Sequence, residues 1–271
     1  MNDEKRHDKE PDFHLSKWYL DGVDDEGNVF IGYHATLWWK RLQLHYARAM
    51  SFRSEGAMEA NTTLRKQNPP QLENSNCTWH PRALKTRGAW KGLLPPIRKT
   101  LLRSEDGEVY WQCHLPKARM EVESGGETLR DALGYAEELH LSVKPWRLPF
   151  GTLRWGRFLS SGDSVIWISW DGPAPLNLVF HNGVGIEQAV VSDTRIEWDG
   201  RNVVLAFSDT AVLLQGPVVS TALAAIPGID TLFPGAVLNI RECKWRSKGM
   251  LTVRGVIKST GWTIHEVVQW Q

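Results

Sequence analysis

Residues 134–159 read GYAEELHLSVKPWRLPFGTLRWGRFL, and this stretch predicts both the fold class and the point where the chain divides. Alternate residues of a strand share one face. One face of the first half of the stretch then carries Tyr135, Glu137, Leu139, Leu141 and Val143. Proline at 145 interrupts strand pairing, and alternation resumes at 153–159. The stretch therefore predicts the last strand of one β unit followed by the first strand of another.

Short alternating segments bounded by turn signals run through the whole chain. Strands are expected at 18–23, 29–37, 41–49, 83–90, 99–103, 109–114, 119–123, 153–159, 164–170, 176–181, 189–191, 194–198, 203–208, 211–214, 236–246, 250–256 and 262–270. Residues 53–76 predict a long loop, and helix is expected only at Thr221–Ala225 and Leu129–Leu133. Antiparallel chains avoid free edges by closing into barrels or packing as sandwiches. We therefore expect an all-β protein with two barrels of about eight strands each.

The two halves of the sequence echo each other, which is typical of duplicated domains. Three residues of the first half recur at a constant offset in the second: Trp18, Ile31 and Tyr33 match Trp155, Ile168 and Trp170. Together with the interruption at proline 145, this predicts domains at 15–143 and 144–271. Residues 1–14 are charged throughout and are expected to be a disordered leader.

Composition excludes several classes of partner. Lys and Arg number 32 against 31 Asp and Glu, so the net charge of +1 favours neither nucleic acid nor an anionic membrane. No apolar run has the length of a transmembrane helix, and the N-terminus lacks the apolar core of a signal peptide. We therefore expect a cytoplasmic protein without a transmembrane segment. The sequence does not indicate its oligomeric state.

No known cofactor motif occurs in the chain. There is no G-x-S-x-G elbow, P-loop or G-x-G-x-x-G fingerprint, which argues against a serine hydrolase, a nucleotide-phosphate enzyme and a Rossmann oxidoreductase. The three cysteines are far apart, and the histidines lack the spacing of a zinc motif. No metal and no other cofactor is expected.

Two apolar stripes, each expected to face the interior of its own barrel, contain one carboxylate apiece. Glu137 lies in the stripe described above, and Glu266 shares a face with Trp262, Ile264, Val268 and Trp270. Desolvation raises the pKa of a buried carboxyl group and leaves a neutral acid that can protonate a substrate. The alternative is a structural ion pair with a buried cation. The candidate cations are Arg154, Arg157, Lys244 and Arg246, and a pair between Glu137 and Arg157 is the leading example.

Three segments carry a family resemblance. They are WYLDGVDDEGNVFIGY at 18–33, GYAEELHLSVKPWRLPFGTLRWGRF at 134–158 and GWTIHEVVQW at 261–270. They resemble the lipocalin-like superfamily of carotenoid 1,2-hydratases (hydroxyneurosporene synthases) and tocopherol cyclases. The resemblance implies two lipocalin-like β domains in tandem. It also implies cofactor-independent hydration or cyclisation of an isoprenoid or polyketide-like substrate.

The hydratase motif Gly-Tyr-His-Asp-His-Asn-Trp-Gly is matched in part by GYAEELHL. Gly134 and Tyr135 match, and Glu137 falls where the motif has Asp. The histidines and the tryptophan are replaced by Ala136, Glu138 and His140. The resemblance thus implies that the acid is retained without its histidine partners, which favours a substrate other than a carotenoid, or no chemistry.

Two functions remain open. The first is an enzyme of the hydratase (lyase) or cyclase (isomerase) type, with Glu137 as general acid and Glu266 as a second candidate. Aromatic side chains, an arginine and a histidine are expected to bind its small hydrophobic substrate: Tyr33, His45, Tyr135, Trp155, Arg157, Trp167 and Trp262. The second is a non-catalytic carrier of a lipophilic ligand, in which the same glutamates are structural.

Overall fold

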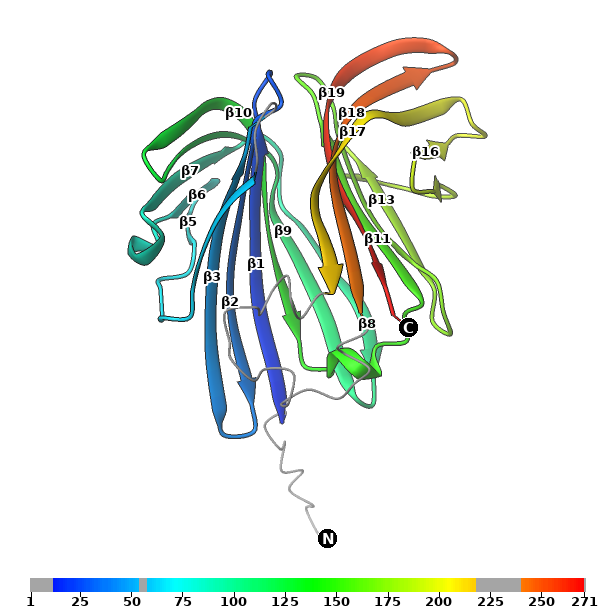
Figure 1. Ribbon diagram of the computed structural model, residues 1–271. Coiled ribbons are helices and arrows are strands. Elements are labelled where there is room, and N and C mark those ends of the chain that lie inside the picture. Colours follow the sequence, from blue (N-terminus) through cyan, green and yellow to red (C-terminus); the bar gives the residue numbers. More distant parts are fainter. Residues whose placement is uncertain (1–11, 54–57, 218–239, 271) are drawn as a thin grey trace, which may run out of the picture.

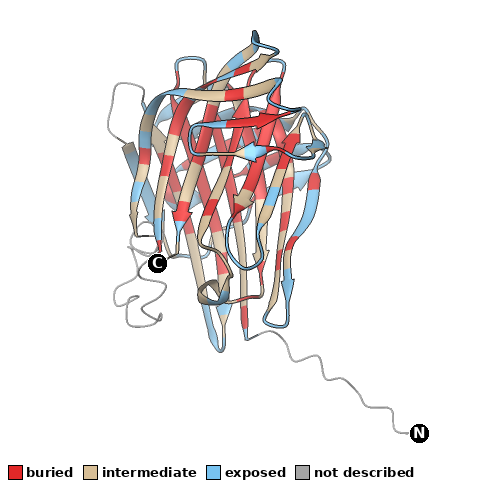
Figure 2. Cartoon of the chain, turned by 90° about the vertical axis from the view of Figure 1, so that its right-hand side faces the viewer, coloured by how far each residue is buried: buried red, intermediate tan, exposed pale blue. Residues whose placement is uncertain are grey.

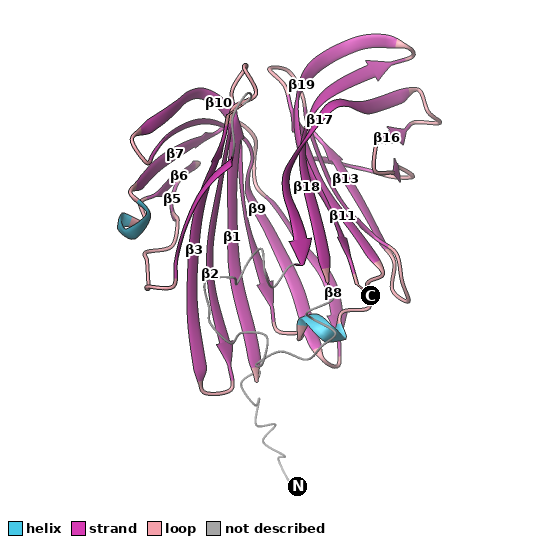
Figure 3. Cartoon of the chain, in the orientation of Figure 1, coloured by secondary structure: helices cyan, strands magenta, loops and turns pink. Residues whose placement is uncertain are grey.

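The computed structural model describes residues 12–53, 58–217 and 240–270. Antiparallel strands make up nearly all of it and form two curled sheets that face each other, as Figures 1 and 3 show. Each sheet is a half-barrel, and the expected all-β fold with two lipocalin-like domains in tandem is confirmed. Helix in the described residues is limited to short 3₁₀ turns, η1 (Arg82–Leu84) and η2 (Pro145–Arg147). No helix in the described residues is long and apolar enough to span a membrane.

The first half-barrel is a ten-stranded sheet in the order β4-β3-β2-β1-β10-β9-β7-β6-β5, with β8 paired to β9. Its strands are β1 (Phe13–Val23), β2 (Val29–Trp39), β3 (Leu42–Phe52), β4 (Met58–Thr63), β5 (Gln71–Glu73), β6 (Asn76–Trp79), β7 (Thr86–Gly92), β8 (Ile97–Ser104), β9 (Gly107–Ser124) and β10 (Glu127–Leu141). The last strand therefore returns to pair with the first, which places β10 in the middle of the sheet.

The second half-barrel is a nine-stranded sheet in the order β14-β13-β12-β11-β19-β18-β17-β16-β15. Its strands are β11 (Thr152–Leu159), β12 (Ser164–Trp170), β13 (Leu176–His181), β14 (Val184–Ile186), β15 (Val190–Val191), β16 (Arg195–Trp198), β17 (Val203–Pro217), β18 (Arg241–Val253) and β19 (Val256–Gln269). Here too the last strand pairs with the first, so β19 lies beside β11.

Two local expectations are wrong. Leu129–Leu133 is part of β10, where the register with β9 shifts and Asp131 has a positive φ of 53°. The helix-like spacing of its leucines therefore reflects a β-bulge. The segment 53–76 contains β4 and β5 because each pairs with a neighbouring strand. The helix expected at Thr221–Ala225 lies outside the described residues.

Apolar side chains form three clusters. One lies inside the curl of the first sheet, one inside the curl of the second, and the largest lies between the two sheets with members from both. Figure 2 shows the buried residues running along the middle of the strands. Alternation in β10 and β19 directs Glu137 and Glu266 toward the space between the sheets. Our expectation that each glutamate lies inside its own barrel is therefore wrong.

The matched residues of the two halves behave differently in the structure. Ile31 and Tyr33 on one side, and Ile168 and Trp170 on the other, all belong to the central cluster between the sheets. The remaining matched pair divides: Trp18 lies inside the first half-barrel, whereas Trp155 packs against the central cluster. The echo therefore reflects equivalent positions in β2 and β12 but not in β1 and β11.

A buried ion pair ties the two sheets together. Arg157 of β11 binds Asp21 of β1, with Nη2 2.7 Å from Oδ1, and the two residues are 2% and 0% exposed. Arg157 Nη1 also donates to the carbonyl oxygen of Trp262, and Tyr19 Oη donates to Asp21 Oδ2 at 2.8 Å. The expected alternative, a pair between Arg157 and Glu137, is not formed in the structure.

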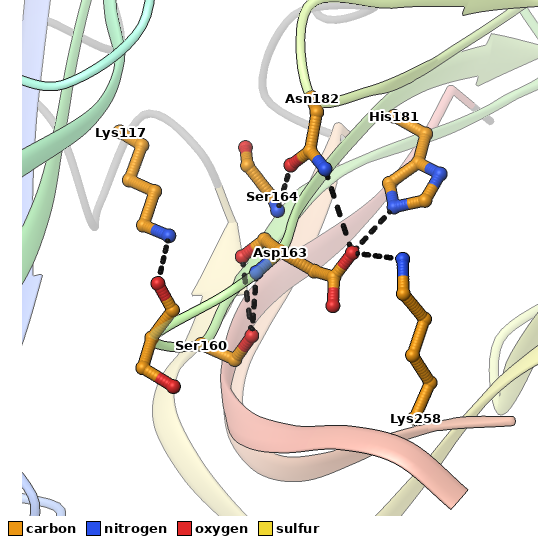
Figure 4. Close-up of polar contacts among 8 residues, drawn as sticks. Lys117, Ser160, Asp163, Ser164, His181, Asn182 and Lys258 are labelled. Atoms are coloured by element: carbon orange, nitrogen blue, oxygen red, sulfur yellow. Dashed lines mark hydrogen bonds and ion pairs between the residues drawn. The ribbon is translucent and has the colours of Figure 1, made fainter.

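A second buried carboxylate organises the turn between β11 and β12. Asp163 Oδ1 accepts hydrogen bonds from His181 at 2.8 Å, Lys258 at 2.7 Å and Asn182 at 3.4 Å (Figure 4). Burial alone would raise the pKa of Asp163, but the hydrogen bonds from Lys258 and His181 lower it to about 2. The carboxylate is therefore ionised and fully engaged in holding the turn.

The same turn also contacts the first sheet. Lys117 Nζ, from β9, donates to the carbonyl oxygen of Ser161 at 2.8 Å (Figure 4). Ser164 Oγ donates in the opposite direction, to the carbonyl oxygen of Pro116 at 3.1 Å. These bonds and the ion pair of Asp21 fix how the half-barrels face each other.

We predict that Arg157→Met lowers the free energy of unfolding by about 3–5 kcal/mol, because it leaves Asp21 buried without its cation. The matched control is Arg154→Met on the same strand, whose partner Asp193 is 58% exposed. That change should cost about 0–1 kcal/mol. Urea denaturation followed by circular dichroism measures both, and equal losses for the two variants would contradict the prediction.

Candidate functional site

A cavity of about 310 Å³ lies between the two half-barrels. Its walls are mainly apolar side chains from β1, β2, β3, β8, β9 and β10 on one side and from β11, β12, β17 and β19 on the other, and β18 contributes Glu242. Residues of the connection at 145–150 complete the lining. The volume and apolar lining are typical of a site for a small hydrophobic molecule.

A smaller polar chamber of about 30 Å³ adjoins this cavity. Lys17, Trp155 and Glu266 line both spaces, so the chamber and the apolar cavity meet at these residues. Glu137 and Tyr135 line only the chamber. The site thus combines a large apolar space with a small region where ionisable groups gather.

Glu137 is the central group of the chamber. Its Oε2 accepts hydrogen bonds from Trp111 Nε1 at 2.6 Å and from Tyr135 Oη at 2.5 Å, and the residue is 8% exposed. Within the described residues, no cation forms an ion pair with this carboxyl group and no donor contacts Oε1. On the other face of β10, Gly134 lets Trp90 of the first half-barrel core pack closely, because a Cβ there would lie 2.7 Å from Trp90 Cδ1 and 2.8 Å from the carbonyl oxygen of Asp21.

Burial raises the pKa of Glu137 to about 7, although the hydrogen bonds from Tyr135 and Trp111 act in the opposite direction. The group is therefore largely a neutral carboxylic acid below that pH. Because Oε2 already accepts from two donors, the acidic proton belongs on Oε1. This arrangement leaves a proton donor in a water-poor chamber.

Glu266 has a different environment, although it lies in an equally apolar stripe. Its Oε2 binds Lys244 Nζ, which also lies 3.7 Å from Oε1 of Glu242. Burial alone would raise the pKa of Glu266, but the charge of Lys244 lowers it. Burial and the Glu266 charge raise the pKa of Glu242. The ion-pair alternative is thus realised at Glu266, which is held as a carboxylate.

The other expected binding residues divide into two groups. Tyr33 and His45 border the large cavity, Tyr135 and Arg157 border the chamber, and Trp155 borders both. The remaining two border neither space. Trp167 faces the core of the second half-barrel, where its ring stacks on Phe207 with ring centroids 5.5 Å apart. Because side chains alternate along β12, its sequence neighbours face the space between the sheets instead.

Trp262 lies beside the larger cavity's wall but does not line it. The guanidinium of Arg246 covers its ring at 4.8 Å. The same guanidinium donates to the carbonyl oxygen of Gly27 in the turn between β1 and β2. Trp262 therefore contributes to the contact between the sheets. Among the residues described, no group of three His, Cys, Asp or Glu side chains converges to hold a metal ion.

Sequence reasoning missed Asp21 and Trp111. Asp21 follows the same rule that identified Glu137, since Tyr19, Asp21 and Val23 are alternate residues on the face of β1 that is turned toward the second sheet. Trp111 lies on the inner face of β9, and only the pairing of β9 with β10 brings it to Glu137. The signal for Asp21 is thus present in the sequence, whereas that for Trp111 depends on which strands pair.

The sequence matches no protein-family model and no curated protein. Solved structures resemble it over most of its length. CghA has a TM-score of 0.63 at 11% identity, covering 95% of this chain and 88% of that chain. A candidate AttH protein from Nitrosomonas europaea has a TM-score of 0.55 at 10% identity, covering 96% and 93%.

Kievitone hydratase from Nectria haematococca is similar to the same extent. Its TM-score is 0.55 at 8% identity, with coverage of 94% of this chain and 88% of that chain. At such identities the likeness concerns the fold, because one fold hosts unrelated functions. The chain thus shares its two-half-barrel architecture with these proteins, and its activity has to be argued from the site.

We predict that the Glu137 carboxyl group makes the protein less stable as pH rises. Its pKa of about 7 in the folded protein lies above the ordinary 4.5, so the folded state keeps a proton that the unfolded state releases. Relative to Glu137→Gln, the wild type should therefore lose about 3 kcal/mol of stability between roughly pH 4.5 and 7, and no more above it. Urea unfolding of both proteins across this range tests this, and parallel stability curves would refute it.

Proposed function

We propose that the protein is an enzyme that binds a hydrophobic small molecule between its half-barrels and protonates it from Glu137. The observation that carries this proposal is a buried carboxyl group that forms no ion pair within the described part of the chain, beside an apolar cavity. Buried carboxyl groups whose charge is uncompensated are typical of acid catalysts. Hydration or cyclisation of a carbon–carbon double bond is the reaction class that such an acid serves.

The substrate in this proposal is isoprenoid or polyketide-like. The cavity of about 310 Å³ has mostly apolar walls, so binding removes apolar surface from water. Ionisable groups gather in the chamber, which meets the cavity where Lys17, Trp155 and Glu266 line both spaces. An elongated apolar molecule would place its reactive double bond toward that side.

The proposed reaction begins with transfer of the Oε1 proton of Glu137 to one carbon of the double bond. A new C–H bond forms, and the other carbon becomes a carbocation beside the Glu137 carboxylate. Water, or an oxygen of the same molecule, then adds to the cation and forms a C–O bond. The added oxygen releases its proton to Glu137, which restores the acid. Proton transfer of this kind needs no redox cofactor.

Side chains around the chamber support the charged intermediate in this proposal. The faces of Trp155 and Tyr135 provide π electron density near the cation. The hydrogen bonds from Trp111 and Tyr135 stabilise Glu137 once it becomes a carboxylate. The asymmetry between neutral Glu137 and ionised Glu266 gives the chamber one acid and one fixed negative charge. Kievitone hydratase, which shares the fold, is named for a hydration and so supports this reaction class.

The first test is mass spectrometry of small molecules extracted from the protein purified from its native host, followed by turnover assays with any bound terpenoid or polyketide. We predict that Glu137→Gln lowers turnover by about 10²–10⁴-fold and leaves binding nearly unchanged, since the amide keeps the shape without the acidic proton. The matched control is Glu138→Gln on the opposite face of β10, where Glu138 contacts His140 at 3.2 Å. This control should keep full turnover.

The outcomes separate the two functions that the sequence left open. A tightly held ligand that neither the wild type nor Glu137→Gln converts would indicate a carrier. Unfolding of Glu137→Gln, with Glu138→Gln stable, would indicate a structural role for the carboxyl group. Either result would overturn the proposed acid catalysis.

The pH dependence gives a separate test. Because the acid form of Glu137 is active, kcat/KM should fall above about pH 7. Tyr135→Phe removes a donor that lowers the pKa of Glu137, so the fall should move to higher pH. Tyr110→Phe serves as the control, since its ring packs near His140 at 6.5 Å. A profile that is the same for the wild type and Tyr135→Phe would contradict the assignment of Glu137.

A further inference from the structure

Trp155 stands at the junction of the two spaces with an unused hydrogen-bond donor. It lines both the apolar cavity and the polar chamber. Its ring packs edge-to-face with that of Trp111, and the ring centroids are 6.1 Å apart. Its Nε1 atom is buried, and no acceptor for it occurs within the described residues. Buried donors are nearly always satisfied in folded proteins, so this one requires an explanation.

The other tryptophans of the cavity do not share this property. Trp170 Nε1 donates to the carbonyl oxygen of Ala174 at 2.7 Å, and Trp270 Nε1 donates to that of Pro145 at 3.4 Å. Trp111, which contacts Trp155 but lines neither space, donates to Glu137. Trp79 also lacks an acceptor, but it lies in the core of the first half-barrel and borders neither space. Trp155 is thus the cavity tryptophan whose N–H is left for another molecule.

A second donor lies at the same junction. The ammonium of Lys17 lines both spaces and lies 5.2 Å from the ring centroid of Tyr33. It forms no ion pair with any residue that the structure describes. The carboxylate of Glu266, the acceptor at this junction, is already bound by Lys244. Two donors for which the described residues offer no acceptor therefore lie where the cavity and the chamber meet.

We propose that Trp155 Nε1 donates a hydrogen bond to a carbonyl oxygen of the ligand, so that the protein selects carbonyl-bearing hydrophobic molecules over pure hydrocarbons. This inference rests on the proposed function, in which the ligand occupies the cavity. A carbonyl oxygen supplies an acceptor that neither an alkene nor an aliphatic chain has. Its position at the junction fixes the orientation of the molecule, with the apolar body in the cavity and the reactive part toward Glu137. Trp155 is then a specificity-determining residue.

The test uses two fluorescent probes that differ at one group, 6-propionyl-2-(dimethylamino)naphthalene and its carbonyl-free counterpart 6-propyl-2-(dimethylamino)naphthalene. Titrations give the dissociation constant of each probe for the wild type, Trp155→Phe and the control Trp170→Phe. The measured quantity is the preference, defined as the dissociation constant of the carbonyl-free probe divided by the dissociation constant of the ketone probe. We expect Trp155→Phe to lower this preference about tenfold, because one hydrogen bond is lost while the ring remains. Trp170→Phe should leave it unchanged.

An equal preference in the wild type and Trp155→Phe would overturn the inference. It would indicate that a water molecule, and not the ligand, accepts the hydrogen bond of Trp155 Nε1. Failure of both probes to bind the wild type would overturn the inference together with the ligand cavity. Glu137→Gln separates the two proposals, since it should keep the full preference even though turnover is lost. Intact turnover in Glu137→Gln, with the preference retained, would reject the acid and keep the selectivity.

A spectroscopic measurement on the wild type covers the case in which Trp155→Phe does not fold. Binding of the ketone should move the indole N–H proton resonance of Trp155 downfield in ¹H–¹⁵N spectra, because the proton enters a hydrogen bond. The carbonyl-free probe should produce no such shift. Equal shifts with both probes would contradict the proposed hydrogen bond.

Discussion

The ion pair between Asp21 and Arg157 is the interaction on which the site depends. Both groups are buried, and they come from the first strand of each half-barrel. Removing either partner would leave a charge without compensation in a region of low dielectric, so the pair constrains how the sheets approach. The chamber lies directly against it, since Asp21 and Arg157 share its wall with Glu137. Fixing the sheets therefore also fixes the space around the acid.

Two glutamates in similar stripes have opposite protonation because, among the residues described, only Glu266 forms an ion pair. Glu137 and Glu266 both face the space between the sheets, and burial acts to raise the pKa of each. Lys244 reverses that effect at Glu266, whereas Arg157, which lines the same chamber as Glu137, binds Asp21. The difference between an acid and a salt-bridged carboxylate is thus decided by which acidic residue binds each cation.

Local pattern predicted much of this arrangement. Strand alternation correctly placed Glu137 and Glu266 on the same faces as their apolar neighbours, and turn signals located most strands. Local pattern could not predict the partners of Arg157 and Glu137. Asp21 is 136 residues from Arg157 in the sequence, and Trp111 approaches Glu137 only through the pairing of β9 with β10. Alternation also gives the relative faces of residues but not which face meets the other sheet. That limit explains why the glutamates were expected inside separate barrels and why Trp167 was grouped with the cavity residues.

The cavity wall and the inner cores of the half-barrels are made of different residues. Each curl encloses its own apolar cluster, while the cavity is lined by side chains of the opposite faces of the same strands. Substitutions in the lining therefore leave the packing inside each half-barrel intact. Such separation lets selection alter the shape and polarity of the cavity without dismantling the scaffold. It offers a physical reason why proteins with 8–11% sequence identity keep this architecture, since the binding surface can diversify while two independent cores preserve the fold.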